Sequence, residues 1–239
     1  MATNPVRDFL VSYLMPTKCY DEIIVNFHMH VPCLKFILNK ACGFWILLDT
    51  LLAPFPQLVK ILWRGSAAGL SLTSNLLQLY AFSGPIVYAI ASNFPLFAWG
   101  ERLFTLVQSA AIVFLILCYR GDTLKGLLFL LAYIAVMFLL GSCASAAIAS
   151  MMQASSLPAL TASKVIQAGT NYFNGHTGQL SSMSVLLSWA GSLAVVFASL
   201  QDTESLFSTV LHLLSACFSC VLLVQLMCYR SSTSKKKTE

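Results

Sequence analysis

Apolar residues along this chain form long runs that are separated by short polar stretches. A helix needs about 17–25 mostly apolar residues to cross the hydrocarbon core of a bilayer. Runs of that length lie near 41–60, 71–92, 99–119, 124–142, 152–173, 182–200 and 206–228. The pattern predicts seven transmembrane helices. The run at 152–173 contains Gln153, Pro158 and Lys164, so six helices with a re-entrant fifth segment are the alternative.

The sequence also repeats itself at a shift of 110 residues. Gln57 then falls on Gln167 and Gly65 on Gly175, and the surrounding hydropathy repeats as well. The repeat predicts an all-α membrane protein with two three-helix units joined by a linker helix. Membrane transporters with such repeats commonly place their binding site near the midplane, between the halves. The expected segments are 1–40 (N-terminal and interfacial), 41–119 (first unit), 120–143 (linker helix), 144–228 (second unit) and 229–239 (basic tail).

Composition agrees with a membrane protein and sets its orientation. Of the 239 residues, 58% are hydrophobic and 10% charged, against about 45–50% and 25% in soluble domains. The net charge of +5 predicts no nucleic-acid partner, because the basic residues lie between apolar runs or in the tail. With seven spans, eight Lys or Arg fall on the side of the C-terminus and five on the other. The positive-inside rule therefore predicts a cytosolic C-terminus and a lumenal N-terminus.

Two charged residues fall inside the predicted spans. An ionisable group at the centre of a bilayer costs at least about 2.5–3.5 kcal/mol, so it normally has a partner or a function. We expect Asp49 and Lys164 to form an ion pair or to line a polar cavity. The alternative is that Lys164 reaches the interface and Asp49 caps a helix break before Pro54. Proline also frees backbone carbonyls, and we expect Gln57 and Gln167 to bond to them.

Signatures of catalysis and of metal binding are missing. The sequence has no clustered carboxylates, nucleophile motif or phosphate-binding glycine loop, so we expect a protein that is not an enzyme and has no cofactor. His28, His30 and Cys33 lack an evident fourth ligand, so we expect no metal. Cys19 and Cys33 are the pair that can form a disulfide in an oxidising lumen.

The motifs of the chain resemble those of a known family. Pro56 and Gln57, followed by the stretch 64–71, resemble the PQ-loop membrane proteins. The stretches 30–35, 92–95, 119–121 and 167–181 are similar to the mannose-P-dolichol utilization defect family within that group. The resemblance implies seven helices in a three, one and three arrangement. It also implies a protein of the endoplasmic reticulum that is required to use dolichol-phosphate-mannose and dolichol-phosphate-glucose for lipid-linked oligosaccharides, N-glycosylation and GPI anchors.

The resemblance also implies site residues and partners. Its motif positions are Pro56, Gln57, Gln167, Asn171 and Asn174, although Ile166 stands where the second motif has proline. The implied partners are the lipid bilayer, dolichol-phosphate-linked sugars and glycosyltransferases of the endoplasmic reticulum. Whether the sugar lipid is flipped, presented or chaperoned stays open, and a PQ-loop small-solute transporter is the alternative function.

The last residues suggest a location. Lys236 and Lys237 lie four and three positions from the C-terminus, which resembles the dilysine signal for retrieval to the endoplasmic reticulum. A generic basic tail is the alternative.

Overall fold

The computed structural model describes residues 5–13, 15–28, 30–201 and 206–235, and every regular element in these ranges is helical. The first part of the chain forms two short helices and a π turn, which are α1 (Pro5–Tyr13), α2 (Thr17–Tyr20) and η1 (Asp21–Val25). The long helices that follow are α3 (Val31–Leu52), α4 (Phe55–Arg64), α5 (Leu72–Ala91), α6 (Gly100–Tyr119), α7 (Thr123–Cys143), α8 (Ala146–Asn174), α9 (Ser182–Ser199) and α10 (Leu206–Lys235), with a short 3₁₀ turn, η2 (Leu96–Ala98), before α6.

Several of these helices are built to cross a membrane. In the described part of the chain, five segments are long and apolar enough, namely Val31–Arg64, Gly100–Tyr119, Thr123–Cys143, Ser182–Ser199 and Leu206–Tyr229. The protein is therefore an all-α, multi-pass membrane protein. The predicted spans at 71–92 and 152–173 form α5 and α8, which are not among the five, so seven spans stay a prediction. α8 is one continuous helix of 29 residues.

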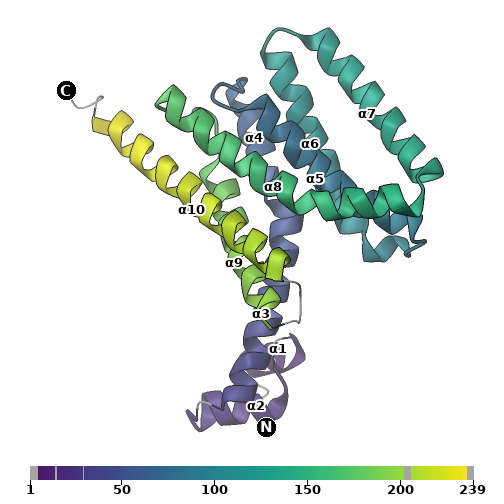
Figure 1. The fold of residues 1–239 in the computed structure, drawn as a ribbon. Coiled ribbons are helices and arrows are strands. Elements are labelled where there is room, and N and C mark those ends of the chain that lie inside the picture. The colour runs from purple at the N-terminus through teal and green to yellow at the C-terminus, as the bar shows by residue number, and fades with distance from the viewer. Residues whose placement is uncertain (1–4, 14, 29, 202–205, 236–239) are drawn as a thin grey trace.

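The helices form two groups of three with the same internal arrangement. In the first group, α6 contacts both α3 and α5, and in the second, α10 contacts both α8 and α9. Two main contacts join the groups, the larger between α5 and α8 and the other between α3 and α9, and a smaller contact joins α4 to α9. α3 in the first unit corresponds to α8 in the second, and α5 corresponds to α9. Exchanging the two units therefore turns the α5–α8 contact into the α9–α3 contact. The groups are thus related by a pseudo-two-fold axis. α7 packs on α6 and α5 at the outer edge of the molecule (Figure 1).

Equivalent residues end and begin helices in the two units. Gly65 and Gly175 follow α4 and α8 in the left-handed conformation, with φ of 58° and 65°, which glycine adopts without steric cost. Ser71 and Ser181 cap the N-termini of α5 and α9, and each side chain accepts a hydrogen bond from the backbone N–H three residues later. The local signals for a turn and a helix start thus recur 110 residues apart.

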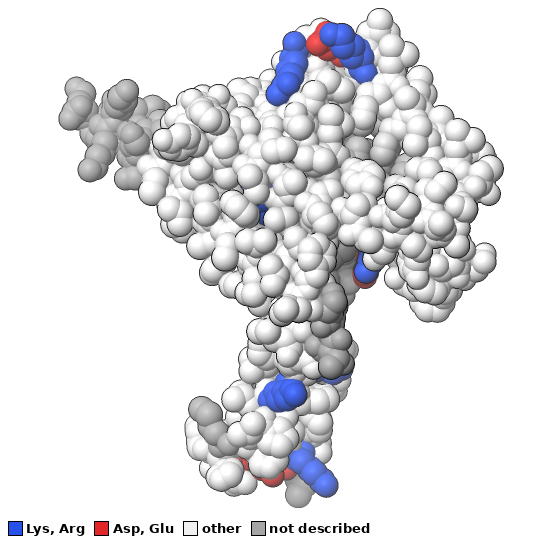
Figure 2. All heavy atoms as spheres, viewed as in Figure 1, with Lys and Arg blue, Asp and Glu red and all other residues white. Residues whose placement is uncertain are grey.

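On the face that Figure 2 shows, charged side chains gather mainly near the two ends of the molecule, and few lie in the wide middle. The N-terminal helices pack against the start of α3, opposite to the end where α10 finishes (Figure 1). α3 begins at Val31, ten residues before the predicted start of the first span, because the helix runs through Lys35 and Lys40. A disulfide between Cys19 and Cys33 ties α2 to the first turn of α3.

Candidate functional site

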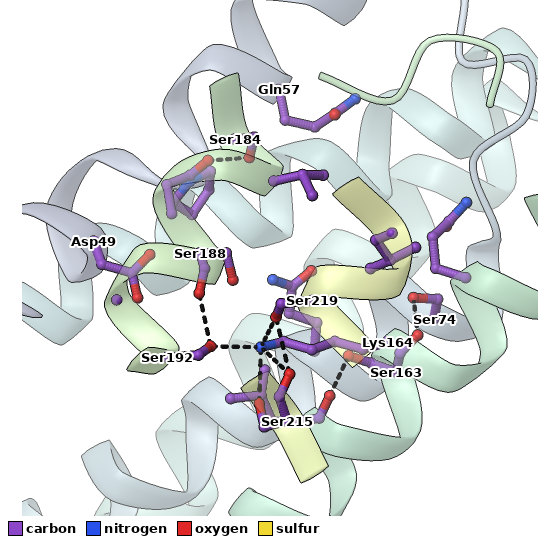
Figure 3. Close-up of a pocket in the computed structure, with 18 of the residues that line it drawn as sticks. Asp49, Gln57, Ser74, Ser163, Lys164, Ser184, Ser188, Ser192, Ser215 and Ser219 are labelled. Carbon is purple, nitrogen blue, oxygen red and sulfur yellow. Dashed lines mark hydrogen bonds between the residues drawn. The ribbon is translucent and has the colours of Figure 1, made fainter. Parts of the chain in front are cut away.

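A polar cavity lies between the two three-helix groups, with a volume of about 240 Å³. Helices of both groups line it, and its wall contains Asp49, Lys164 and seven serines. Figure 3 shows the two charged side chains directed toward this space from different helices. The cavity occupies the place that the repeat predicted for a binding site.

Lys164, on α8, ends inside the cavity. Its side chain is held by hydroxyl groups of the second unit, and only 8% of the residue is exposed. The ammonium donates hydrogen bonds to the side-chain oxygens of Ser192 (3.0 Å), Ser215 (2.8 Å) and Ser219 (2.7 Å). These three oxygens match the three N–H donors of an ammonium. Lys164 therefore keeps its charge group within the helices and does not extend to the interface.

Asp49, on α3, faces the cavity from the other unit. Its Oδ1 atom is buried and has no hydrogen-bond partner among the described residues. The carboxylate lies against the bare Cα of Gly191 on α9, where an added Cβ would meet the Asp49 side chain. No direct ion pair joins Asp49 to Lys164 among the described residues. The two opposite charges line one cavity and leave room between them.

Gln57, on α4, joins its unit to the loop before α9. Its Nε2 donates to the carbonyl of Gln179 (3.1 Å), and its Oε1 accepts from the backbone N–H of Ser181 (2.6 Å). Lys60, one turn further on, donates to the carbonyl of Leu180 (2.7 Å). One helix of the first unit thus holds three consecutive residues of the second.

Gln167, on α8, makes the same two bonds in the opposite direction. Its Nε2 donates to the carbonyl of Gly69 (3.1 Å), and its Oε1 accepts from the backbone N–H of Ser71 (3.0 Å). Asn171 supports it, because its Oδ1 accepts a further bond from Gln167 (2.9 Å) while its own amide donates to Gln225 (3.0 Å). We call Gln57, Gln167 and the four backbone groups that they bind the glutamine clasp.

The loops in the clasp touch each other directly. The N–H of Gln179 donates to the carbonyl of Ala68 (2.8 Å). Gly69 and Gly178 lie so close that a Cβ on Gly69 would stand 2.8 Å from the Cα of Gly178. A backbone approach of this kind requires glycine. The two loops therefore close one face of the space between the units.

The carbonyls at the proline break after α3 are satisfied by other side chains than we expected. Thr105 and Gln108, both on α6, donate to the carbonyls of Thr50 and Leu51. Ser184, on α9, donates to the carbonyl of Ala53. The expectation that Gln57 and Gln167 bond to carbonyls freed by proline was wrong, because they donate to the carbonyls of Gln179 and Gly69. Their amides instead fit the edge of the opposite loop, which offers a carbonyl and an N–H two residues apart.

Pro56, Asn171 and Asn174 do not line the cavity. Pro56 is the second residue of α4, a position where the missing N–H costs nothing. Asn174 is exposed at the last turn of α8, whereas Asn171 is fully buried. Lys236 and Lys237 lie outside the described residues.

The sequence analysis did not predict that the hydroxyls of Ser192, Ser215 and Ser219 surround the Lys164 ammonium. The signal was present, since Ser188 and Ser192, and likewise Ser215 and Ser219, are four residues apart within apolar helices. That spacing places two hydroxyls on one helix face. A polar face on a membrane helix indicates a cavity or a helix contact.

Comparison with known proteins finds a family match in the first unit. No solved structure matches the chain. The PQ-loop repeat family matches residues 38–98, which contain Asp49, the proline break and Gln57. Residues 38–98 are therefore similar to a PQ-loop repeat.

Proposed function

We propose that this protein is an accessory factor of the endoplasmic reticulum membrane, required for the use of dolichol-phosphate-mannose and dolichol-phosphate-glucose in lipid-linked oligosaccharide and GPI-anchor synthesis. It receives the phosphate and the sugar of these donors in the cavity and leaves glycosyl transfer to separate enzymes. The observation that carries the proposal is the Lys164 ammonium, held among serine hydroxyls inside a membrane protein.

The wall of the cavity suits each part of such a donor. The phosphodiester carries one negative charge, which the Lys164 ammonium attracts. A charge-assisted hydrogen bond from the ammonium to the phosphate replaces one of its three bonds to serine. Sugar hydroxyls find acceptors and donors on the serines, and Asp49 Oδ1 is a buried acceptor without a partner in the described structure. Pockets for drug-sized ligands measure about 300–1,000 Å³, so a cavity of about 240 Å³ fits one small headgroup. The isoprenoid chain stays in the lipid.

The resemblance of the stretch 167–181 supports the same function. Gln167, Gln179 and Ser181 all belong to the glutamine clasp, so the most distinctive part of that stretch builds the closed face of the cavity. The disulfide between Cys19 and Cys33 supports a lumenal N-terminus, since disulfides persist in oxidising compartments.

A small-solute transporter is the second candidate. Two repeat-related units that enclose a cavity and close one face of it favour this function, because alternating access needs two such bodies. A transporter would require Lys164 for solute flux across vesicles. It would leave the oligosaccharide intermediates of the cell unchanged.

Depletion and replacement of the protein test the proposal. Cells that lack it are given the wild type, Lys164→Met or Lys125→Met, and their lipid-linked oligosaccharides are analysed by size. Lys125 is a matched control because it pairs with Asp122 at the surface, with 71% of its side chain exposed. We expect truncated oligosaccharides with normal dolichol-phosphate-mannose synthesis in depleted cells and in the Lys164→Met cells only. Full-length oligosaccharides in depleted cells would refute the proposal.

A further inference from the structure

Side chains of a type that bind metal ions converge at the start of α3, far from the cavity. Glu22 belongs to the π turn η1, His30 precedes α3, and Cys33 is in its first turn. His30 Nδ1 lies 3.4 Å from Glu22 Oε2, and Cys33 Sγ lies 3.7 Å from the same oxygen. The three ligand atoms all fall within 4.8 Å of one another. The disulfide places the Cys19 sulfur directly beside them.

Two of these separations are close to edges of a zinc tetrahedron, and the sulfurs of Cys19 and Cys33, which the disulfide joins, must part on reduction to form another edge. Bonds from zinc measure about 2.3 Å to thiolate sulfur, 2.0–2.1 Å to imidazole nitrogen and 2.0–2.2 Å to carboxylate oxygen. A tetrahedral angle between such bonds puts nitrogen and oxygen about 3.3 Å apart, and oxygen and sulfur about 3.5 Å apart. The observed distances of 3.4 and 3.7 Å differ from these by only a few tenths of an ångström.

We propose that Cys19, Glu22, His30 and Cys33 bind one Zn²⁺ ion when the disulfide is reduced. A dithiol supplies the two electrons and two protons that convert the disulfide into two thiols, and is itself oxidised to a disulfide. Zn²⁺ then displaces one proton from each thiol and binds both thiolates. The Nδ1 lone pair of His30 and one oxygen of Glu22 complete four ligands. This proposal is independent of the function of the cavity.

The chain around the site favours this ligand set. The ligands come in two pairs with identical spacing, since two residues separate Cys19 from Glu22 and two separate His30 from Cys33. Paired ligands at short spacing are typical of structural zinc sites. The side chains of His30 and Glu22 are 46% and 42% exposed, which leaves the ion a path of entry. In either redox state the same residues tie α2 to α3, through a disulfide or through the metal.

Cobalt binding to the full-length protein in detergent tests this site. A water-soluble phosphine reduces the disulfide and becomes a phosphine oxide by taking up the oxygen of one water. We expect the reduced wild type to bind one Co²⁺ with the intense visible bands of a tetrahedral thiolate complex, and Zn²⁺ to displace it. The oxidised protein should show no such bands, because the sulfurs of Cys19 and Cys33 are bonded to each other and offer no thiolate.

Single substitutions assign the ligands. Cys33→Ser should abolish the thiolate bands, and Glu22→Gln should weaken Zn²⁺ binding by more than about 100-fold, since even outer-shell changes cost 10–100-fold. Glu22→Gln keeps the disulfide, so the oxidised variant shows whether the fold is intact. His28→Ala and the double variant Cys217→Ser, Cys220→Ser are controls that should bind as the wild type does. Absence of tetrahedral bands in the reduced wild type, or unchanged bands in Cys33→Ser, would overturn the proposal.

Discussion

Replacing Gln57 by leucine removes both hydrogen bonds by which the first unit holds the loop before α9. The buried N–H of Ser181 loses its acceptor, and the half-buried carbonyl of Gln179 loses its donor. An unsatisfied buried group costs about 1–3 kcal/mol and an ordinary hydrogen bond contributes about 1 kcal/mol. We therefore expect Gln57→Leu to lower the free energy of unfolding by about 2–4 kcal/mol.

Gln167→Leu should destabilise the protein by about 1 kcal/mol more than Gln57→Leu. It breaks the equivalent bonds to Gly69 and Ser71, and it also breaks the bond to Asn171. The double variant should lose less than the sum of the two single losses, because residues in one network are coupled and the two loops contact each other directly.

Unfolding in detergent micelles measures these losses, provided that the transition is reversible. Asn174→Ala is the matched control, because it removes an exposed amide at the end of the helix that carries Gln167 and should change stability by less than about 0.5 kcal/mol. Losses at Gln57 and Gln167 as small as that at Asn174 would show that the clasp does not hold the units together. Strict additivity would show that its two halves are independent.

Three further changes test other parts of the structure. Lys164→Met should abolish function in the depletion assay while the protein stays folded, because the hydroxyls of Ser192 and Ser219 keep their hydrogen bonds to carbonyls of their own helices. A collapse of the fold would contradict this. Gly191→Ala places a Cβ 2.6 Å from that of Asp49 and should lower the free energy of unfolding by about 1–3 kcal/mol. Gly169→Ala, with open space around it, should stabilise α8 by about 0.5–1 kcal/mol. Equal melting temperatures of the two variants would argue against the packing described. Cys19→Ala removes a disulfide across a separation of 14 residues. Without reductant it should lower the free energy of unfolding by about 3 kcal/mol relative to the wild type. A loss that persists when both proteins are reduced would show that it does not come from the disulfide.

Hydropathy predicted the helices well because lipid imposes a length and a composition on any helix that it surrounds. It was least informative for α5 and α8, the two helices that pack most closely on each other. Their contact buries polar residues such as Ser74 and Ser163, whose hydroxyl and carbonyl are bonded at 2.6 Å. Gly84 allows this approach, since a Cβ there would stand 2.9 Å from the carbonyl carbon of Met152. Helices that face one another need less apolar surface than helices that face lipid.

The main residues of the candidate site could be predicted from the sequence, but the residues that they contact could not. The repeat paired Gln57 with Gln167, and the cost of a charge in lipid singled out Asp49 and Lys164. The partners of these residues come from positions about 30–125 residues away in the chain, and no local pattern specifies which helices meet. The crossed contacts of the clasp follow from the pseudo-two-fold axis, which is a property of the assembled fold.

The measurement that tests the central claim most directly is the binding of dolichol-phosphate-mannose to the purified protein in lipid nanodiscs. Dolichol without phosphate and free mannose phosphate are the comparison ligands, and Lys125→Met is the matched control variant. The account predicts saturable binding of the phosphorylated sugar lipid by the wild type and by Lys125→Met, at least a 10-fold loss in Lys164→Met (about 1.4 kcal/mol), and no saturable binding of dolichol. Equal affinity of wild type and Lys164→Met for the sugar lipid would contradict it.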